Sequence, residues 1–422
     1  MKDVAYKSAL LLQLLTMMIP FMPSYTAYAS MVLFVAYLMV KGVYVDKAYM
    51  RWMLVVFGFF SLSAVWAINW KVSAYKLVYD LLPIYVAMAA SYTFMKKSPN
   101  ALKSILWIYI IASGFLILYM IFNLGDIRAM VEGERLGTIL NENAGVEDGT
   151  ETKFNSNVIG MNLCYTLYAG YVLLFKNSKS FIKQVVLLPA AVVIIYLIMV
   201  TGSRKALVLL LLPFVVFPLL NRNRGKTMLI LPVSLGLVIG TYYLIMNVPV
   251  LYEILGTRVE EFFNIVSGTE TGTEDVSRLF LIEYGLEWFK ENPIFGYGIN
   301  NFRVLSNNTE LFAGRNFYAH NNYIELLVGV GIVGTLIYYS CYFYFWKRLR
   351  KTTSGNMLRS WVVVLIVAAL FLDFASVSYY GLIHNLILCI CFYAVGKDAK
   401  QNGRLATQKK YKYETGRHHP AL

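Results

Sequence analysis

The chain has 422 residues, of which 58% are hydrophobic and 15% are charged. Soluble globular proteins carry about 25% charged residues, so this composition excludes a set of soluble domains, and its hydrophobicity excludes a disordered chain. The hydrophobic residues form repeated runs of about 16 to 22 residues, close to the length of a helix that crosses a bilayer. The sequence therefore predicts an all-α polytopic membrane protein.

The cysteines indicate neither a disulfide framework nor a metal centre. All four lie inside apolar runs, where cysteine behaves as a small hydrophobic residue. None is spaced from a histidine in the way a zinc site requires, so we expect no metal and no cofactor. The four are Cys164, Cys341, Cys389 and Cys391.

The formal net charge of +14 would suit a nucleic-acid-binding protein, but its distribution indicates a membrane topology instead. Basic residues collect in every second connector between apolar runs, as the positive-inside rule describes for cytoplasmic loops. Acidic residues collect in two long polar stretches, 125–157 and 247–319, which we expect to be external. No nucleic-acid partner is expected. The basic connectors hold Lys41, Lys47, Arg51, Lys96, Lys97, Lys103, Lys176, Lys179, Lys183, Arg222, Arg224, Lys226, Lys347, Arg348, Arg350, Lys351 and Arg359.

This alternation predicts about 12 transmembrane spans within residues 1–396, with both termini in the cytoplasm. Lys2 and Lys7 precede a first span with no small-residue cleavage site, so we expect no cleavable signal peptide. Residues 397–422 form a basic cytoplasmic tail that anionic lipids would attract. The expected spans are 8–23, 25–40, 52–68, 74–95, 104–123, 157–175, 184–200, 206–220, 227–246, 320–346, 360–379 and 381–396.

The external loop of residues 247–319, between spans nine and ten, is too long to lack structure, and its pattern predicts two amphipathic helices. The first has an apolar stripe with a stop at a glycine, and the second begins at a threonine cap and ends at Asn292-Pro293. Their apolar faces are expected against the transmembrane body or the outer lipid interface. The first stripe is Leu255, Val259, Phe262 and Val266 before Gly268; the second, after Thr273, is Leu279, Ile282, Leu286 and Phe289.

Four ordered motifs between residues 157 and 335 resemble the superfamily of O-antigen ligases and O-antigen or capsular polysaccharide polymerases. Each motif is weak alone, but the ordered set is specific. The tight glycine path at Gly296 and Gly298 belongs to the third motif. The motifs are Thr201-Gly202-Ser203-Arg204, the helix that Arg278 opens, Asn292-Pro293-Ile-Phe-Gly-Tyr-Gly-Ile-Asn-Asn-Phe302, and His320-Asn-Asn-Tyr-Ile-Glu-Leu326 followed by Gly329, Gly331 and Gly334.

The resemblance implies a glycosyltransferase in the bacterial cytoplasmic membrane that acts at the outer leaflet without a metal. Its donor would be an oligosaccharide on a polyprenyl diphosphate such as undecaprenyl diphosphate, and its acceptor a sugar hydroxyl. A chain-length regulator protein is a further candidate partner, besides the membrane lipids. Polymerisation of O-antigen, capsular or exopolysaccharide repeat units is the favoured activity. The alternative is a ligase that transfers O-antigen to lipid A core.

External arginines are candidates for binding the diphosphate, because guanidinium is permanently charged and bidentate. Arg204 and Arg278 are the leading candidates, partly through the resemblance. Arg204 stands out because the positive-inside rule works against a basic residue at an external span end. An ion pair with a loop acid is the simpler explanation for the supporting candidates, which are Arg258, Arg303 and Arg315.

His320 is the candidate catalytic base, because a neutral imidazole can take a proton from a hydroxyl at neutral pH. It lies where the external loop meets the tenth span, at the expected level of a lipid diphosphate. A helix-start residue bonded to local backbone is the structural alternative. Glu325 could orient the imidazole or pair with an arginine. Asp80, Asp373 and His384 are predicted in the outer parts of their spans, where they could line a polar cavity or serve helix packing.

Two other classes of protein remain in competition. A lipid-linked oligosaccharide flippase or other transporter would need pseudo-symmetric halves and charges near mid-bilayer, and the sequence shows neither. A metal-dependent oligosaccharyltransferase could use the loop acids Glu147-Asp148 and Glu274-Asp275. Solvated external acids explain those residues more simply.

Overall fold

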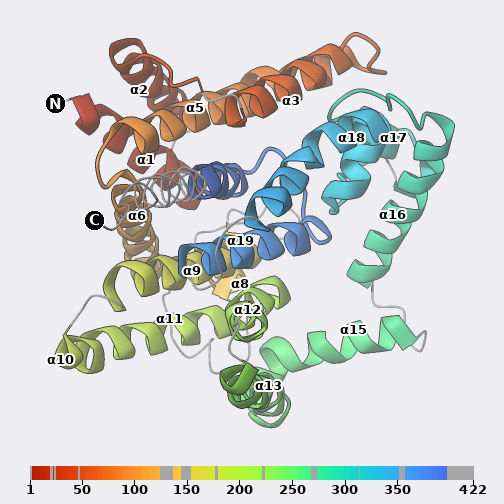
Figure 1. The fold of residues 1–422 in the computed structure, drawn as a ribbon. Coiled ribbons are helices and arrows are strands. Elements are labelled where there is room, and N and C mark those ends of the chain that lie inside the picture. The colour runs from red at the N-terminus through yellow and green to blue at the C-terminus, as the bar shows by residue number, and fades with distance from the viewer. Residues whose placement is uncertain are drawn as a thin grey trace, which may run out of the picture.

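The computed structural model describes most of the chain, and its described residues form helices and turns without a strand (Figure 1). All statements below concern these residues. The described ranges are 2–19, 22, 25–45, 48–123, 136–143, 154–175, 179–220, 224–267, 273–312, 314–350 and 357–396. The tail of residues 397–422 and the acids Glu147 and Asp148 lie outside them.

The first half of the chain forms long helices joined by short connectors, several of them with a π-helical turn. The helices are α1 (Lys2–Met18), α2 (Tyr25–Lys41), α3 (Tyr49–Ser63), α4 (Trp70–Tyr75), η1 (Lys76–Leu81), α5 (Leu82–Lys97), α6 (Ala101–Asn123), α8 (Leu136–Asn143), α9 (Ser156–Gly170), η2 (Tyr171–Phe175), α10 (Ser180–Ile182), η3 (Lys183–Leu187), α11 (Leu188–Val200) and α12 (Arg204–Leu220).

The second half holds the long polar insertion and three further long helices. Its elements are α13 (Arg224–Asn247), α14 (Pro249–Leu251), η4 (Tyr252–Gly256), α15 (Thr257–Ser267), α16 (Thr273–Glu291), α17 (Phe302–Asn307), η5 (Glu310–Phe312), α18 (Asn322–Leu349), α19 (Met357–Asp373) and a last helix, Leu382–Gly396.

The predicted spans coincide with helical segments, although their bounds differ. The first helix runs from Lys2 to Met18 rather than over residues 8–23. By length and composition, five described helices can cross a membrane, or six if a bent pair counts as one span. The count of 12 spans therefore stays a prediction. The five are Trp70–Lys97, Ala101–Asn123, Ser156–Leu174, Ser180–Val200 and Asn322–Leu349.

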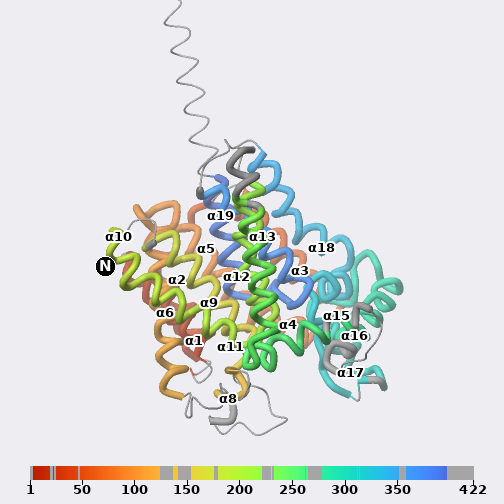
Figure 2. The backbone as a smooth tube through the Cα atoms, turned by 90° about the horizontal axis from the view of Figure 1, so that it is seen from below, coloured from red at the N-terminus to blue at the C-terminus, as the bar shows by residue number. Residues whose placement is uncertain are grey.

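The helix Trp70–Lys97 lies inside the bundle, whereas Ser180–Val200 lies at its edge. In the most apolar window of the first helix 72% of the residues are buried, against 6% in the second. Figure 2 shows α8, from the first acidic stretch, and α17, from the second, at the same end of the bundle. These two helices therefore share one end, while residues 124–135 and 144–153 of the first stretch lie outside the described ranges.

Helices do form in the polar insertion, but the buried face of α16 differs from the predicted stripe. Leu279 and Leu286 are 47% and 40% exposed, whereas Leu281 is 2% exposed. Gly285 lies on this buried face, where a Cβ would come within 3.1 Å of the Phe302 ring. Ile282 and Phe289 of the predicted stripe do pack against the core of the insertion, so the prediction was wrong only for Leu279 and Leu286. The exposed leucines remain available to the lipid interface.

The first insertion helix turns away from the bundle axis. The segments Pro232–Asn247 and Pro249–Glu261 meet at an angle of 95°. The helical turn of η4 and α15 therefore runs across the end of α13 rather than continuing along it. This bend leads the chain from α13 toward α16 (Figure 1).

The segment after Pro293 is inserted into a break in α18. At Gly331 the backbone of α18 is not helical, with φ 62° and ψ −172°. The amide of Ile332, freed by this break, donates to the carbonyl of Pro293 at 2.8 Å, and the Tyr297 amide donates to the Val328 carbonyl at 2.8 Å. Backbone groups inside a membrane protein need such partners, because lipid offers none.

Side chains of α3 and α4 hold the other side of this inserted segment. The Ser63 hydroxyl accepts from the Ile299 amide at 3.0 Å, and the Ser73 hydroxyl donates to the Ile299 carbonyl at 2.7 Å. The carboxamide of Asn301 accepts from the Asn69 amide at 2.9 Å and donates to Ser73 at 2.8 Å. The insertion thus fixes the polar loop to two parts of the bundle that are far apart in sequence.

Replacing Gly331 with Ala should destabilise the protein by about 2 kcal/mol or more, the sum of a left-handed backbone and a steric clash. A Cβ at this position would lie 2.5 Å from the Phe295 nitrogen. Thermal unfolding of the purified protein in detergent measures the effect. Gly114→Ala in α6 is the control, since nothing lies within 4 Å of its Cβ, and it should be neutral or slightly stabilising. Equal unfolding temperatures for the two variants would contradict the packing described here.

Candidate functional site

His320 is held in an unusual backbone conformation immediately before α18. Its φ angle is 51°, in the left-handed region that residues with a Cβ seldom adopt. Asn321 caps α18 by accepting from the amides of Tyr323 at 2.9 Å and Ile324 at 3.2 Å. Glu325 accepts from the Ala319 amide at 2.8 Å. The cap and this carboxylate therefore fix the backbone on both sides of His320.

The imidazole of His320 is partly buried among aromatic and cationic side chains. Its ring lies 4.0 Å from that of Tyr318, centroid to centroid. Burial, and then the charges of Arg278, Lys205 and Arg303, lower the pKa of His320 from 6.5 to about 4. The imidazole is therefore neutral at physiological pH, which is the state a general base requires.

Three cations, Arg204, Lys205 and Arg278, form what we call the cationic cluster. Lys205 interacts electrostatically with both arginines, although they come from α12 and α16. The Lys205 ammonium donates to the carbonyl of Ala375, and Arg204 Nη1 donates to the carbonyl of Arg258 at 3.1 Å. The cluster thus joins α12 to α15, α16 and the end of α19. Positive charges held close together favour an anionic ligand.

The turn before α12 sets the direction of Arg204 and Lys205. Thr201 donates to the Ile198 carbonyl at 2.6 Å, which closes the end of α11. Ser203 donates to the side chain of Asn157 at 2.8 Å, which connects the turn to the start of α9. The polar residues of the first motif are therefore structural, and they place the two basic residues that follow.

A second group of charges includes Arg303, whose charge also acts on His320. Arg303 lies over the ring of Tyr318, with its guanidinium carbon 5.2 Å from the centroid. Lys76 forms an ion pair with Asp80 at 2.7 Å and lies 3.2 Å from the centroid of the Tyr380 ring. Buried Glu325 interacts with both Arg303 and Lys76. This group therefore combines two cations with two carboxylates.

A buried hydrogen-bond network fixes the start of α18 to the end of α19. Asn322 accepts from the amides of Ser378 at 3.0 Å and Tyr379 at 3.1 Å, and donates to Tyr339 at 2.9 Å. Tyr339 in turn donates to Asp373 at 2.7 Å. His320, two residues before Asn322, is thereby held to the bundle.

Asp373 and His384 serve this network rather than an open cavity. Asp373 accepts from Ser378, and its carboxylate lies 3.8 Å from the His384 ring. His384 is also hydrogen-bonded to Tyr338 at 3.1 Å. Of the two uses that the sequence allowed for these residues, the structure supports helix packing.

The structure brings most of the predicted site residues together. The charges of Arg278, Arg303 and Lys205 lower the pKa of His320. Arg204 is the neighbour of Lys205 and interacts with it electrostatically. Arg258 contributes a backbone carbonyl. Arg315 is exposed, and its described hydrogen bonds use its own backbone amide and carbonyl rather than its guanidinium. Glu325 bonds to the backbone beside His320 rather than to its imidazole.

Three residues of the site and its surroundings were not predicted. Lys205 was visible only as a neighbour of Arg204, and Tyr318 only as part of an aromatic run. Lys76 could have been noticed as a lysine inside an apolar span, paired four residues later with Asp80. Its association with Glu325 could not, because the two are far apart in sequence.

No group of three or more metal-ligating side chains occurs among the described residues. The backbone of Glu274 and Asp275 lies in α16, and Glu147 and Asp148 lie outside the described ranges. The loop-acid alternative therefore stays a question for experiment.

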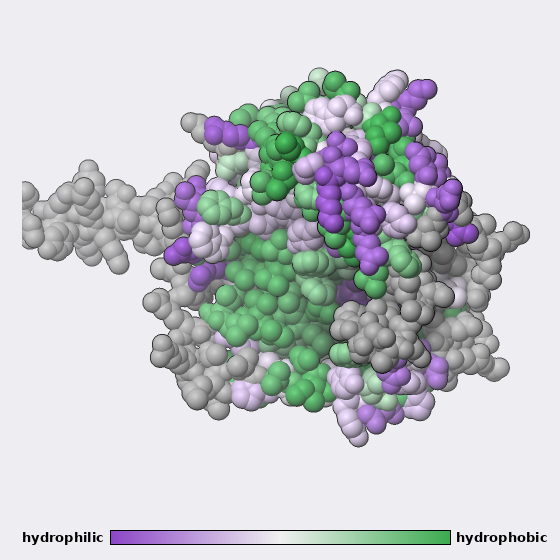
Figure 3. Space-filling model, turned by 90° about the vertical axis from the view of Figure 1, so that its right-hand side faces the viewer, coloured by the Kyte–Doolittle hydropathy of each residue, from purple (hydrophilic) through white to green (hydrophobic). Residues whose placement is uncertain are grey.

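A broad hydrophobic hollow lies on the face of the molecule that carries α15, α16 and α18, with hydrophilic surface at its margin (Figure 3). An apolar hollow that opens sideways in a membrane protein is accessible to lipid chains.

We expect the imidazole of His320 to stay neutral down to about pH 5, because its pKa is about 4. The folded state then binds fewer protons than the unfolded state between pH 6.5 and 4, so stability should fall as the pH falls through that window. NMR of protein with ¹³C-labelled histidine measures the titration, and His320→Asn identifies the resonance. Lys205→Gln should raise the pKa, whereas Lys347→Gln should not. An imidazole already protonated at pH 6 would contradict this electrostatic description.

Residues 189–339 match the family described as O-antigen ligase. The match covers α11 to the middle of α18 and includes Arg204, Arg278 and His320. The comparison with curated proteins finds no significant match. This match, over about a third of the chain, supports the O-antigen ligase/polymerase superfamily, whose members are glycosyltransferase-like enzymes, and the apolar helices indicate a membrane protein.

Proposed function

We propose that the protein transfers a glycan from a polyprenyl diphosphate carrier to a sugar hydroxyl, with His320 as the base and Arg204 and Arg278 as ligands of the diphosphate. The observation that carries this proposal is a neutral imidazole beside three cations. An anion held by these cations would lie next to a group able to accept a proton. Few other reactions need both at a membrane surface.

The chemistry is a single displacement at the anomeric carbon of the donor sugar. The acceptor oxygen forms a bond to that carbon while the bond from the carbon to the phosphate oxygen breaks. The acceptor proton passes to a ring nitrogen of His320, and the electron pair of the broken bond leaves on the polyprenyl diphosphate. Attack opposite the leaving group inverts the anomeric configuration. Arginine suits the leaving group because its fixed, bidentate charge stabilises the anion that develops.

The two groups of charges around His320 would have different roles. The cationic cluster would hold the diphosphate. Lys76, Asp80, Arg303 and Glu325 are balanced, and they would orient the acceptor hydroxyl or the backbone of His320. A cation close to the imidazole also keeps it unprotonated before the reaction. After proton transfer, the departing diphosphate would offset the new positive charge.

The hydrophobic hollow of Figure 3 would admit the polyprenyl chain from the side. The headgroup would then reach the cations without the chain leaving the lipid. In the proposed topology the site faces the periplasm or cell exterior, with both termini in the cytoplasm. The basic residues in alternate connectors support this orientation.

Within this function we favour a polymerase of O-antigen, capsular or exopolysaccharide repeat units. A ligase that uses lipid A core as acceptor fits the same residues. A strain that lacks the protein distinguishes the two. Loss of a polymerase leaves single repeats, whereas loss of a ligase leaves long chains on the carrier.

Two further activities have direct tests. A flippase would move labelled carrier lipid across vesicles without forming glycosidic bonds. A metal-dependent transferase would lose its activity in a strong chelator, whereas the proposed mechanism predicts activity that survives it. The charge group around His320 favours transfer chemistry over either.

His320→Ala should abolish glycan transfer while the protein remains in the membrane. Cells that carry the variant should accumulate single lipid-linked repeats in place of the polymer ladder on a gel. The reason is that no other neutral base among the described residues adjoins the cationic cluster. Full-length polymer in these cells would refute the assignment of His320.

Arg278→Gln should lower the transfer rate by about 100-fold, the typical effect of removing one group that stabilises a leaving anion. Arg278→Lys should restore only part of it, because an ammonium lacks the bidentate geometry. The matched control is Arg315→Gln, an exposed arginine of the same insertion outside the cluster. The rates are measured in membranes with a lipid-linked donor. A similar loss in both glutamine variants would point to general loop charge rather than to a diphosphate site.

A further inference from the structure

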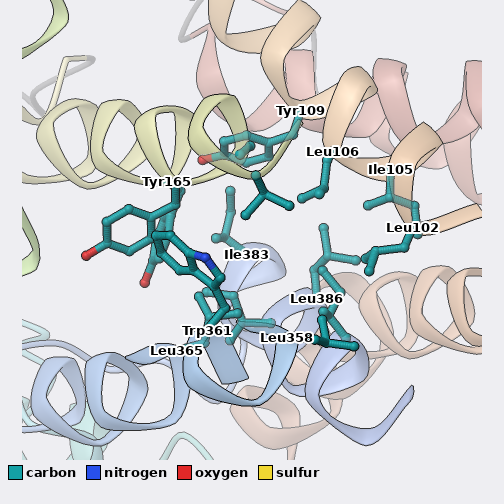
Figure 4. A pocket seen from close by; sticks show the side chains of 15 residues that line it. Leu102, Ile105, Leu106, Tyr109, Tyr165, Leu358, Trp361, Leu365, Ile383 and Leu386 are labelled. Carbon is teal, nitrogen blue, oxygen red and sulfur yellow. The ribbon is translucent and has the colours of Figure 1, made fainter. Parts of the chain in front are cut away.

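A second cavity lies inside the bundle, away from His320. It has a volume of about 360 Å³ and lies between α6, α9, α19 and the last helix. Figure 4 shows side chains from these helices facing one space. The lining is almost entirely apolar, with Leu106, Tyr109, Tyr165, Leu365 and Ile387 among its members. Protein interiors rarely leave such a space empty, because unfilled walls lose their packing contacts.

One lining residue carries a polar group without a partner. Trp361 is only 8% exposed, and its indole Nε1 is buried with no hydrogen-bond partner among the described residues. In Figure 4 the indole nitrogen lies on the side of the ring that faces the cavity. A buried N–H of this kind usually has an acceptor. The missing partner would be a ligand oxygen.

The cavity reaches the basic end of the bundle. Leu102 and Leu358 line it, and they are the second residues of α6 and α19. Lys103 and Arg359 are their neighbours in the same first turns, and Arg359 Nε is buried with no hydrogen-bond partner in the part of the chain that the structure describes. By the positive-inside rule these helix starts lie at the inner leaflet. An apolar space with a cationic rim matches an anionic lipid.

The position of the cavity separates it from the diphosphate site. The cationic cluster contacts Ala375, beyond the far end of α19, whereas the cavity adjoins the first two turns of that helix. The polyprenyl diphosphate bound at the cluster would thus have its headgroup at the opposite leaflet. The cavity needs a lipid of the inner leaflet.

We propose that this cavity binds an acyl chain of an anionic glycerophospholipid from the inner leaflet. The chain fills the space between the four helices, the Trp361 indole donates to an ester carbonyl, and Arg359 with Lys103 binds the phosphate. Trp361 lies in the second turn of α19, close to the depth of the ester groups. The site is independent of the proposed glycan transfer.

Native mass spectrometry of the full-length purified protein tests the proposal, with phosphatidylglycerol and phosphatidylethanolamine as probes. The wild type should retain phosphatidylglycerol in preference. Arg359→Gln should weaken its retention about fivefold, the effect of one cation beside an anionic lipid, and should weaken that of phosphatidylethanolamine less, because the ammonium of that headgroup already offsets its phosphate. Trp361→Phe should weaken both lipids, because both carry ester carbonyls. Leu106→Trp should displace both by filling the space.

Lys347→Gln is the control, since Lys347 is an exposed basic residue at the same end of the bundle, on α18. It should retain phosphatidylglycerol as the wild type does. Gel filtration and thermal unfolding show whether each variant is folded. If Leu106→Trp does not fold, Trp361→Phe still tests the site, because it keeps an aromatic ring at that position. Equal retention of the two lipids by the wild type would overturn the proposal. So would unchanged retention in Arg359→Gln, or an equal loss in Lys347→Gln.

Discussion

The structure depends on the pairing between the broken helix α18 and the segment after Pro293. A helix interrupted at Gly331 leaves backbone groups that lipid cannot satisfy, and the carbonyl of Pro293 and the amide of Tyr297 satisfy them. This pairing anchors a polar insertion to the bundle by its main chain. Since His320 follows the insertion and precedes α18, its position is determined from both sides.

The electrostatics of the site follow from that arrangement. The insertion brings Arg278 and Arg303 to the imidazole, while α12 contributes Lys205 from the bundle. The family match covers both parts, from residue 189 to residue 339. The candidate site is thus shared between the helical bundle and the polar insertion, as the proposed reaction at a membrane surface would require.

The sequence predicted the helices better than the contacts between them. Apolar runs marked the spans, and local stripes marked α15 and α16, because both signals lie within one helix. The predicted buried face of α16 was wrong at Leu279 and Leu286. The buried side instead includes Gly285, which carries no apolar signal. The break at Gly331 was also missed, since a glycine in an apolar run usually indicates helix packing. Lys76 was absent from the predicted site because its contacts with Arg303 and Glu325 join distant segments.

The left-handed backbone at His320 has a consequence for folding. A side chain in this region raises the energy of the native state by roughly 1–2 kcal/mol, which glycine would not. The catalytic candidate therefore occupies a position where the residue best for stability is not the residue needed for chemistry. Such a conflict is typical of reactive centres, where strain persists because the surroundings enforce it. The proposed polymerase would thus make its product with a backbone that stays slightly strained at His320.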